Sequence, residues 1–411
     1  MNTLKDTGFR RIYLDNAAST PIMDEAFNEM IPYLTTHYGN PSSLHAFGYE
    51  SNKALELARK RVSSIIGAKT SEIIFTSSGT EADNIALKGA AYYVRKRNPY
   101  KNHVITSAIE HDAVLESCFD LENNGFEVSY LPVNRDGLVR KEKLAELVSD
   151  KTALVSIMLA NNEVGTIQPI QELVRIVRER SEFILFHTDA VQALGKIHVN
   201  CRELGVDLMT LSSHKINGPK GVGGLYLRDG SRVNSLTSGG GQEKDLRSGT
   251  ENVHGIVGFG KACEILMQRM DGINKGIRRL RDILVKRIIN EIPLVRYNGP
   301  SDSDIRLPNI AHLTFLGING EDLLIKLDEY GVAASTGSAC SMRTQKESHV
   351  LRAMGFDLPG ISGSLRLSLG PYNTEDEIDR AISVLKVAVA ELREVSPVRN
   401  TSIDKLEPKS L

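Results

Sequence analysis

Short apolar runs alternate with helix-like segments along the chain from about residue 60 to residue 230. A helical spacing of apolar residues follows most of these runs, for example at 113–124 and 171–181. The runs that predict strands lie at 72–77, 103–108, 126–131, 152–160, 183–188 and 206–212. Strands that alternate with helices predict an α/β fold with a mostly parallel sheet.

The alternation of expected strands and helices ends at the turn-rich segment 238–252. A long helical stretch follows, which begins near Val257 and ends near Ile292. We expect a second, smaller α+β domain to begin near the middle of this stretch. It contains the expected strands 310–317 and 364–370 and ends in the helix 375–395. The tail 396–411 has two prolines and mixed charges and is expected to be flexible.

The composition of the 411 residues favours a globular protein with a large core, because 41% of them are hydrophobic. Lys plus Arg (50) nearly balance Asp plus Glu (51), so no global field attracts nucleic acid or an acidic membrane. The sequence predicts neither a membrane span nor a signal peptide, and hence a cytoplasmic protein. Its four cysteines (Cys118, Cys201, Cys263, Cys340) lie far apart without a CxxC pair, so we expect neither disulfides nor a metal site.

Lys215 stands where the expected strand 206–212 ends and a glycine-rich turn begins. Ligands of parallel sheets gather at the carboxyl ends of the strands. A lysine that is partly desolvated at such a place can act as a nucleophile or form a Schiff base. The alternative is an ordinary surface lysine at a strand end.

Other polar residues follow strands of the same expected sheet. Asp189 ends the run 183–188 and would stay ionised beside a cation such as a pyridinium nitrogen, or would cap a helix. His187 together with Asp189 suggests a metal pair, but the sequence places no third ligand. His111 follows the strand 103–108, where it can stack on a planar cofactor, move protons or serve the structure alone.

The segment SSGTEADN (77–84) joins an expected strand to a helix through small residues. Free backbone N–H groups at such a turn form a phosphate cradle, and the missing Walker lysine disfavours a nucleoside triphosphate. The alternative is a capping box that involves Glu81. Asn161, Asn162 and Gln192 add amide groups to the same edge.

Arg366 and Cys340 carry a charged and a reactive side chain at positions where such groups are unusual. Arg366 lies between leucines in the expected strand 364–370, so it either holds a ligand carboxylate or forms an internal salt bridge. Cys340 lies in a run of small residues that predicts a mobile, exposed loop, where a thiol is a reactive group. The other three cysteines lie in helix-like contexts and are expected to be structural.

Motifs in a fixed order along nearly the whole chain resemble those of cysteine desulfurases of the iron–sulfur cluster and nitrogenase-maturation type, in the class V aminotransferase group. These motifs lie at 12–21, 38–48, 77–84, 110–117, 161–165, 187–196, 212–221, 247–252, 335–340, 348–355 and 364–370. The resemblance implies a pyridoxal-phosphate enzyme of fold type I with a seven-stranded sheet. It also implies a large cofactor-binding domain at 21–267 and a small domain, formed by 1–20 and 268–395, that carries the cysteine loop.

Carried over by position, the resemblance makes Lys215 the Schiff-base lysine and Asp189 the partner of the pyridine nitrogen. Gln192 would donate to the phenolic oxygen of the cofactor, and His111 would stack on its ring and take part in catalysis. The residues implied to bind the phosphate are Gly79, Thr80, Ser212 and His214, with Thr250 from the neighbouring subunit. That last role implies a homodimer.

The resemblance also implies the reaction. Asn162 and Arg366 would bind the carboxylate of L-cysteine, and Cys340 would be the nucleophile that receives the sulfur. The products would be L-alanine and a persulfide, which is passed to an acceptor protein such as a cluster scaffold. A selenocysteine lyase, a class V transaminase and an inactive assembly scaffold stay as alternatives, although a transaminase needs no loop cysteine.

The chain departs from the family pattern just after Cys340. Many relatives have small residues and a Glu-Pro pair there, whereas this chain has SMRTQKE (341–347). Our hypothesis is that Arg343 and Lys346 favour the thiolate of Cys340 or dock an acidic acceptor.

Overall fold

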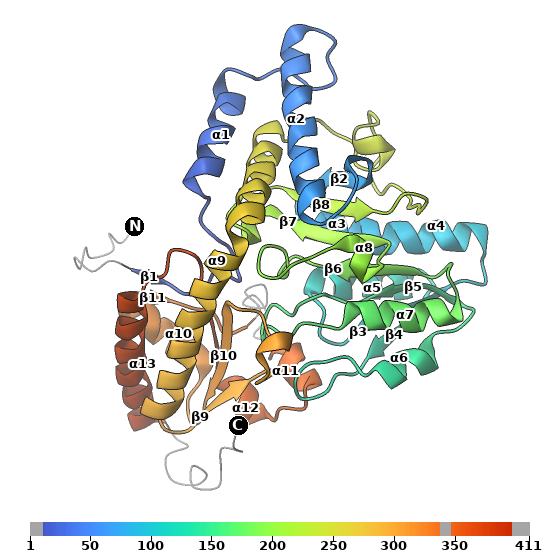
Figure 1. The fold of residues 1–411 in the computed structure, drawn as a ribbon. Helices are drawn as coiled ribbons and strands as arrows, with labels where there is room; N and C mark the ends of the chain where they lie inside the picture. The colour runs from blue at the N-terminus through green and yellow to red at the C-terminus, as the bar shows by residue number, and fades with distance from the viewer. Residues whose placement is uncertain (1–10, 338–346, 397–411) are drawn as a thin grey trace. The chain divides into compact units, whose positions relative to one another are not determined.

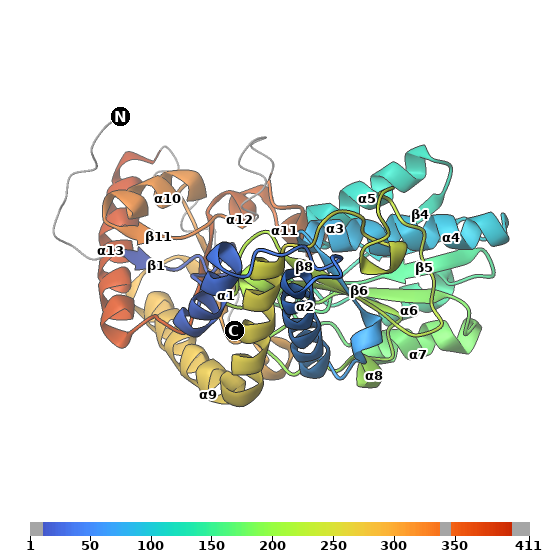
Figure 2. The ribbon, with the colours of Figure 1, turned by 90° about the horizontal axis from the view of Figure 1, so that it is seen from above.

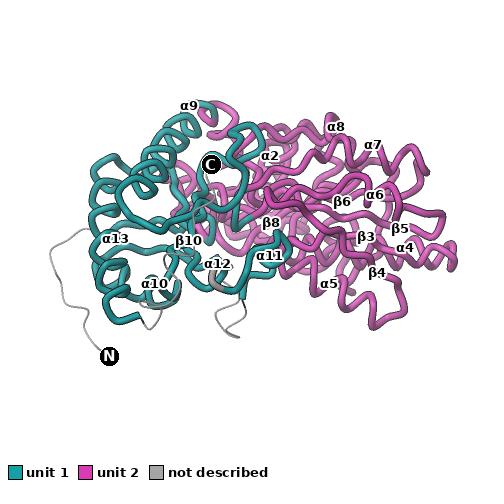
Figure 3. Tube along the Cα trace, turned by 90° about the horizontal axis from the view of Figure 1, so that it is seen from below, with its two compact units in different colours: residues 1–18, 162–165, 271–411 teal, residues 19–161, 166–270 magenta. Residues whose placement is uncertain are grey.

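The computed structural model describes residues 11–337 and 347–396. Contacts between Cα atoms divide the chain into two compact units (Figure 3). Unit 1 contains residues 1–18, 162–165 and 271–411, and unit 2 contains residues 19–161 and 166–270. The assignment of cofactor binding to one domain and of the cysteine loop to the other stays a prediction.

A seven-stranded sheet forms the centre of unit 2 (Figure 1). Its strands in spatial order are β2 (Ile73–Thr76), β8 (Gly223–Leu227), β7 (Leu208–Ser212), β6 (Leu185–Asp189), β5 (Thr152–Ser156), β3 (His103–Ser107) and β4 (Glu127–Leu131). Only β8 runs antiparallel to its neighbours, so the predicted mostly parallel α/β sheet is confirmed. Strand β8 was not predicted from the sequence, because its glycines indicate a turn.

Helices cover both faces of this sheet, with α3, α4 and α5 on one side and α6, α7 and α8 on the other (Figures 1 and 2). In α7, Ile170, Leu173, Val174 and Val177 are buried, which is the i, i+3, i+4, i+7 spacing of a helix that packs one face on a core. The helices of this unit are α1 (Asp24–Thr35), α2 (Ala46–Ile65), α3 (Gly79–Asn84), α4 (Ala90–Arg97), α5 (Asp112–Asn123), α6 (Lys141–Leu147), α7 (Ile170–Arg180), α8 (Cys201–Leu204) and the first part of α9 (Val253–Glu291). One turn of π-helix, Ile85–Gly89, joins α3 to α4.

Unit 1 is built on a smaller, antiparallel sheet. Its strands are β12 (Ser364–Ser368), β10 (Ile310–Phe315) and β9 (Val295–Asn298), and the short strands β1 (Ile12–Tyr13) and β11 (Val332–Ala333) form a separate parallel pair. Its helices are α10 (Gly320–Glu329), α11 (His349–Ala353), α12 (Leu358–Ser362), α13 (Glu375–Val395) and the remainder of α9. Leu313, Leu367 and Ile382 are part of its apolar core, so this unit has the predicted α+β architecture.

The sequence features that start two helices are visible in their capping contacts. Thr374 and Glu377 form a capping box at the start of α13, where a helix was predicted from residue 375. Ser78 accepts the N–H of Glu81 at the start of α3. Within the part of the chain that the structure describes, no helix is long and apolar enough to cross a membrane.

Candidate active site

Strand register brings the ends of three strands together at one edge of the sheet of unit 2. Gly223 pairs with Thr76 on one side and with Ser212 on the other. A Cβ atom on Gly223 would lie 2.4 Å from the carbonyl carbon of Ser78, so only glycine permits this approach. The segment after β2 and the segment after β7 therefore meet at this edge.

The start of α3 has the form of the predicted phosphate cradle. A Cβ atom on Gly79 would lie 3.0 Å from Cγ2 of Val191 and 3.5 Å from Cβ of Ser212, so three chain segments converge on this glycine. The first N–H groups of a helix have no partner within the helix and attract anions. Ser78 and Glu81 also make capping contacts, with the Glu81 carboxylate accepting from the N–H of Ser77. The capping alternative is therefore present at this turn, and phosphate binding there stays a prediction.

Lys215 lies in a single 3₁₀ turn, Ser213–Lys215, that follows β7 directly. Residues 19–20 contact this turn through His214. Thr20 donates to the carbonyl oxygen of His214 through its hydroxyl (2.8 Å), and Ser19 Oγ lies 3.2 Å from Nδ1 of His214. Burial and the charges of Lys215 and Lys220 lower the pKa of His214 to about 4, so its ring is neutral at pH 7.

A second lysine, which the sequence analysis missed, supports the turn. Nζ of Lys196 donates to the carbonyl oxygen of Lys215 over 3.2 Å. Lys196 is 8% exposed, and burial lowers the pKa of its amine to about 8. No local pattern indicated this role, because Lys196 follows a glycine after the expected strand, a position that is typical of a surface residue.

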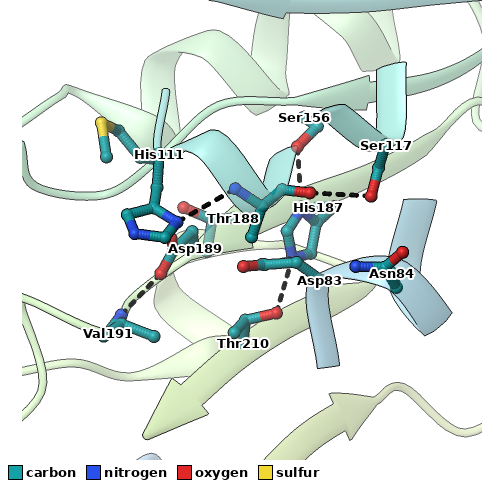
Figure 4. Close-up of polar contacts among 12 residues, drawn as sticks. Asp83, Asn84, His111, Ser117, Ser156, His187, Thr188, Asp189, Val191 and Thr210 are labelled. Atoms are coloured by element: carbon teal, nitrogen blue, oxygen red, sulfur yellow. Dashed lines mark hydrogen bonds and ion pairs between the residues drawn. The ribbon is translucent and has the colours of Figure 1, made fainter. Parts of the chain in front are cut away.

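Asp189 ends β6, and its Oδ1 accepts the N–H of Val191 (2.8 Å; Figure 4). Burial raises the pKa of Asp189, whereas this N–H group and the charges of His111 and Lys215 lower it. His111 and Lys215 are thus near enough to act on the carboxyl. A cation placed against Asp189 would hold it in the ionised form, so the site suits a protonated ring nitrogen.

His111 also caps the helix that follows it. Its Nδ1 accepts the N–H of Ala113 over 3.1 Å, which fixes the ring at the start of α5 (Figure 4). The structural and the functional interpretations of this histidine are compatible, because the cap uses only one ring nitrogen.

His187 is a fully buried histidine of the core. Its Nδ1 lies 2.8 Å from Ser156 Oγ and its Nε2 lies 3.1 Å from Thr210 Oγ1. Burial lowers its pKa to about 3, so the ring is neutral. In the described residues, no three or more His, Cys, Asp or Glu side chains are arranged to hold a metal ion, and His187 is engaged by hydroxyl groups.

In unit 1, Arg366 is 2% exposed and contacts two other segments of that unit. It donates to the carbonyl oxygen of Asn162 (2.9 Å) and forms an ion pair with Asp15 (3.0 Å). Its Nε has no hydrogen-bond partner among the described residues. The internal salt bridge, one of the two alternatives for Arg366, is therefore present. The two terminal nitrogens of the guanidinium have partners, whereas Nε has none among the described residues.

The remaining predicted residues differ in exposure. Gln192 is buried three positions after Asp189, whereas Thr80 and Thr250 are exposed. The side chain of Asn161 donates to the carbonyl oxygen of Ile109 (3.0 Å), so it ties two loops together. Cys340, Arg343 and Lys346 lie outside the described residues.

The other three cysteines, Cys118, Cys201 and Cys263, are buried free thiols, as the sequence predicted for structural cysteines. Burial raises the pKa of Cys118 to about 12. It raises the pKa values of Cys201 and Cys263 as well. None of the three is therefore suited to act as a thiolate.

Comparison with known proteins agrees with this geometry. The model of the family "Aminotransferase class-V" matches residues 12–381. A cysteine desulfurase IscS of Clostridium botulinum is 45% identical over 400 residues, which cover 97% of this chain and 100% of that protein. A solved structure of a NifS-like protein superposes with a TM-score of 0.87 and 42% identity, covering 93% of this chain and 100% of that one. The structure of SspA in complex with cysteine has a TM-score of 0.75 and 35% identity, covering 88% and 100%.

The parallel sheet, the lysine turn after β7 and the cradle before α3 define a pyridoxal-phosphate enzyme of fold type I. The predicted cofactor class and fold are confirmed. The chain belongs to the class V aminotransferase family.

Proposed function

We propose that this protein is a cysteine desulfurase, which removes the sulfur of L-cysteine and releases L-alanine. The observation that carries the proposal is the convergence of the Lys215 turn, Asp189 and the Gly79 cradle at one sheet edge. The extent of similarity to cysteine desulfurases, over 97% of this chain, supports the substrate.

Pyridoxal phosphate, when bound, supplies an electrophilic carbon for the amino group of the substrate and a ring that takes up electron density. Lys215 Nζ would hold that carbon, and its amine would take the proton removed from the substrate Cα. The Asp189 carboxylate would hold a proton on the ring nitrogen, and Gln192 would donate to the phenolic oxygen. His111 would stack on the ring, and the residues that would bind the phosphate are Gly79, Thr80, Ser212 and His214.

Arg366 and Asn162 bind the carboxylate of the substrate in this proposal. The support is the buried guanidinium of Arg366, whose Nε has no partner among the described residues. Since Asp15 already takes part of its charge, we expect the substrate carboxylate to be oriented by Arg366 rather than bound tightly by it.

Cys340 is the proposed nucleophile. Its thiolate attacks the sulfur of the substrate, so that an S–S bond forms as the C–S bond breaks. The electron pair of the broken bond stays on the substrate carbon, which takes up a proton and becomes the methyl group of alanine. The persulfide on Cys340 then passes its outer sulfur to an acceptor such as a cluster scaffold.

We also propose that the protein is a homodimer. Large apolar side chains are exposed on α1, on α2 and on the segment between them, namely Phe27, Ile31, Leu34, Tyr38, Leu44, Phe47 and Tyr49. An apolar surface of this extent is typical of a protein interface. Thr250, which is also exposed, would reach the phosphate of the partner's cofactor. The three buried free thiols support a reducing compartment such as the cytoplasm.

One assay tests the function. The purified holoenzyme is given L-cysteine and a dithiol reductant, which is oxidised to its disulfide as it releases the persulfide sulfur as sulfide, and sulfide and alanine are measured together. We expect equal amounts of both, and none of either with Lys215→Ala. Cys340→Ser should abolish sulfur transfer, whereas Cys263→Ala, a buried thiol outside the site, is the matched control. Full activity of Cys340→Ser would contradict the proposal, and turnover of selenocysteine alone would favour a selenocysteine lyase.

A further inference from the structure

Asp83 is a buried carboxyl group without a cationic partner. It lies on α3, is 2% exposed and belongs to the side-chain cluster of Figure 4. In the part of the chain that the structure describes, no lysine or arginine forms an ion pair with it, and its Oδ1 has no hydrogen-bond donor. Among the described residues, the ionic contact that it makes is with Nε2 of His187, 3.7 Å from Oδ1.

His187 cannot serve as that cation. Both of its ring nitrogens already face hydroxyl oxygens, those of Ser156 (2.8 Å) and Thr210 (3.1 Å). Burial keeps the pKa of His187 at about 3, so the ring carries no charge at neutral pH. An ionised Asp83 would therefore be a buried and uncompensated charge, which is among the costliest states in a protein interior.

The charges that face Asp83 and Asp189 differ. Burial and the negative neighbours Asp189 and Glu110 raise the pKa of Asp83, and only a hydrogen bond with Thr210 lowers it. On Asp189, by contrast, the N–H of Val191 and the charges of His111 and Lys215 act to lower the pKa. When two buried carboxyl groups lie close together, the proton goes to the one with fewer positive neighbours. That group is Asp83.

We propose that Asp83 is a positioning residue for the cofactor, an uncharged carboxylic acid behind Asp189 that leaves the single negative charge of the pair on Asp189. The inference rests on the proposed role of Asp189 beside the ring nitrogen. Strand β6 presents His187 and Asp189 on the same face, and Thr210 of β7 is the register partner of Asp189. The Asp83 cluster thus lies directly behind the residue that it supports.

Infrared spectroscopy of the holoenzyme at pH 7 tests the charge of Asp83. A protonated carboxyl group has a carbonyl stretch that a carboxylate lacks, and two groups are expected to contribute, Asp83 and Glu110. Labelling the wild type with carboxyl-¹³C aspartate should shift the band of Asp83 and leave that of Glu110. Asp83→Asn should remove the shifted band, and Glu110→Gln, the matched control, should remove the other. A spectrum without a protonated aspartate band overturns the proposal.

A double-mutant cycle on the dissociation constant of pyridoxal phosphate tests the positioning role. We expect Asp83→Asn alone to weaken binding only about twofold, because the amide replaces a neutral acid of the same shape. In the Asp189→Asn background Asp83 becomes the acid that carries the charge, so the same change should cost about tenfold. An equal factor in both backgrounds would show a merely structural residue and overturn the proposal.

The two proposals fail in different ways. If Asp189→Asn binds the cofactor as tightly as the wild type does, the proposed role of Asp189 is wrong, and with it the positioning role of Asp83. The infrared result is independent of that outcome, because it reports the charge of Asp83 directly. A retained aspartate band with normal Asp189→Asn binding therefore identifies the failure as one of the proposed function, whereas an absent band with weakened Asp189→Asn binding identifies it as one of the Asp83 proposal.

Discussion

Two buried acids of unit 2, Glu243 and Asp83, differ in whether an arginine or lysine forms an ion pair with them. Glu243 is 8% exposed, and its two carboxylate oxygens accept from Arg59 at 2.7 and 2.9 Å and from the N–H of Phe75 at 2.7 Å. Asp83 is 2% exposed and has no ion pair with a lysine or arginine in the described part of the chain. Burial of the two groups is similar, so the difference lies in what compensates their charge.

The comparison distinguishes an acid that serves the structure from acids that serve a ligand. Glu243 has its own cation and fastens the segment before Thr250 to β2, which completes its role within the fold. The pair of Asp83 and Asp189 carries one negative charge, on Asp189, on which the positive charges of His111 and Lys215 act and to which the N–H of Val191 donates. A cationic ligand that binds beside such a charge compensates it. We therefore interpret Asp189 as the position at which the protonated ring nitrogen of the cofactor binds.

The largest effect should come from neutralising Asp189. Asp189→Asn keeps the shape of the side chain and removes its charge, so we expect kcat/KM for alanine formation to fall about 10³-fold. Unfolding of the cofactor-free protein in urea should change little, because no paired charge is lost. A loss of activity below tenfold, or a strongly destabilised protein, would place Asp189 in the same class as Glu243.

Glu243→Ala should have the converse effect. It leaves the buried guanidinium of Arg59 without its main partner, so the free energy of unfolding should fall by about 3–5 kcal/mol. Urea denaturation measures this change. Asp229→Asn, which breaks the exposed pair with Lys69, is the matched control and should change stability little. If Glu243→Ala had the same free energy of unfolding as the wild type, the ion pair of Glu243 with Arg59 would not stabilise the fold. The contrast between Glu243 and Asp83 would then be wrong.

The third effect is a dependence of stability on pH from Glu110. Burial raises the pKa of Glu110 to about 8, although the hydroxyl of Ser107 and the N–H of Met158 lower it. The native state therefore keeps a proton that the unfolded chain loses near pH 4.5, and stability falls as pH rises between these values. The contribution approaches about 1.4 kcal/mol per pH unit and ends above pH 8.

Urea unfolding of the cofactor-free protein between pH 5 and pH 9 measures this slope. Glu110→Gln should be flatter than the wild type by that amount, since the amide does not titrate. Parallel profiles for the two proteins would show that Glu110 is ionised in the native state and would weaken the argument that acids at this site are neutral.

The smallest effect concerns the backbone that carries Glu243. Glu243, Lys244 and Asp245 have φ angles of 46°, 60° and 63°, a left-handed turn of three non-glycine residues. Asp245→Gly should stabilise the protein by about 1 kcal/mol, because glycine adopts this region without a steric penalty. Thermal unfolding measures the gain, and Asp245→Ala is the control that should destabilise. A lower stability of Asp245→Gly would show that the side chain of Asp245 stabilises the fold by more than its left-handed backbone conformation costs.

The sequence predicted the part of the site that follows from strand ends. Lys215, Asp189 and the segment at 77–84 each follow an apolar run, and in a parallel sheet such ends lie at one edge. The structure places all three there. It also reveals β8, which sequence periodicity could not indicate, because its first residues are glycines, and close backbone contact rather than burial of a side chain requires the first of them, Gly223.

Asp83 and Lys196 were missed for another reason. Each depends on what lies opposite in the folded chain, and local patterns do not report that. A signal for Asp83 was available: it shares a helical face with Ala86, Leu87 and Ala90, all buried, so an acid at this position is out of place. For Arg366 the sequence left two alternatives, and the ion pair with Asp15 shows that one of them is present.

The position of β8 between β2 and β7 has a consequence for the order of events during synthesis. Gly223 completes the edge where the phosphate cradle and the lysine turn meet, yet its partner Thr76 is made far earlier. A nascent chain that ends before β8 has the cradle sequence but lacks the strand that joins it to the turn. Pairing over such a separation is slow, so cofactor binding marks a late stage of maturation.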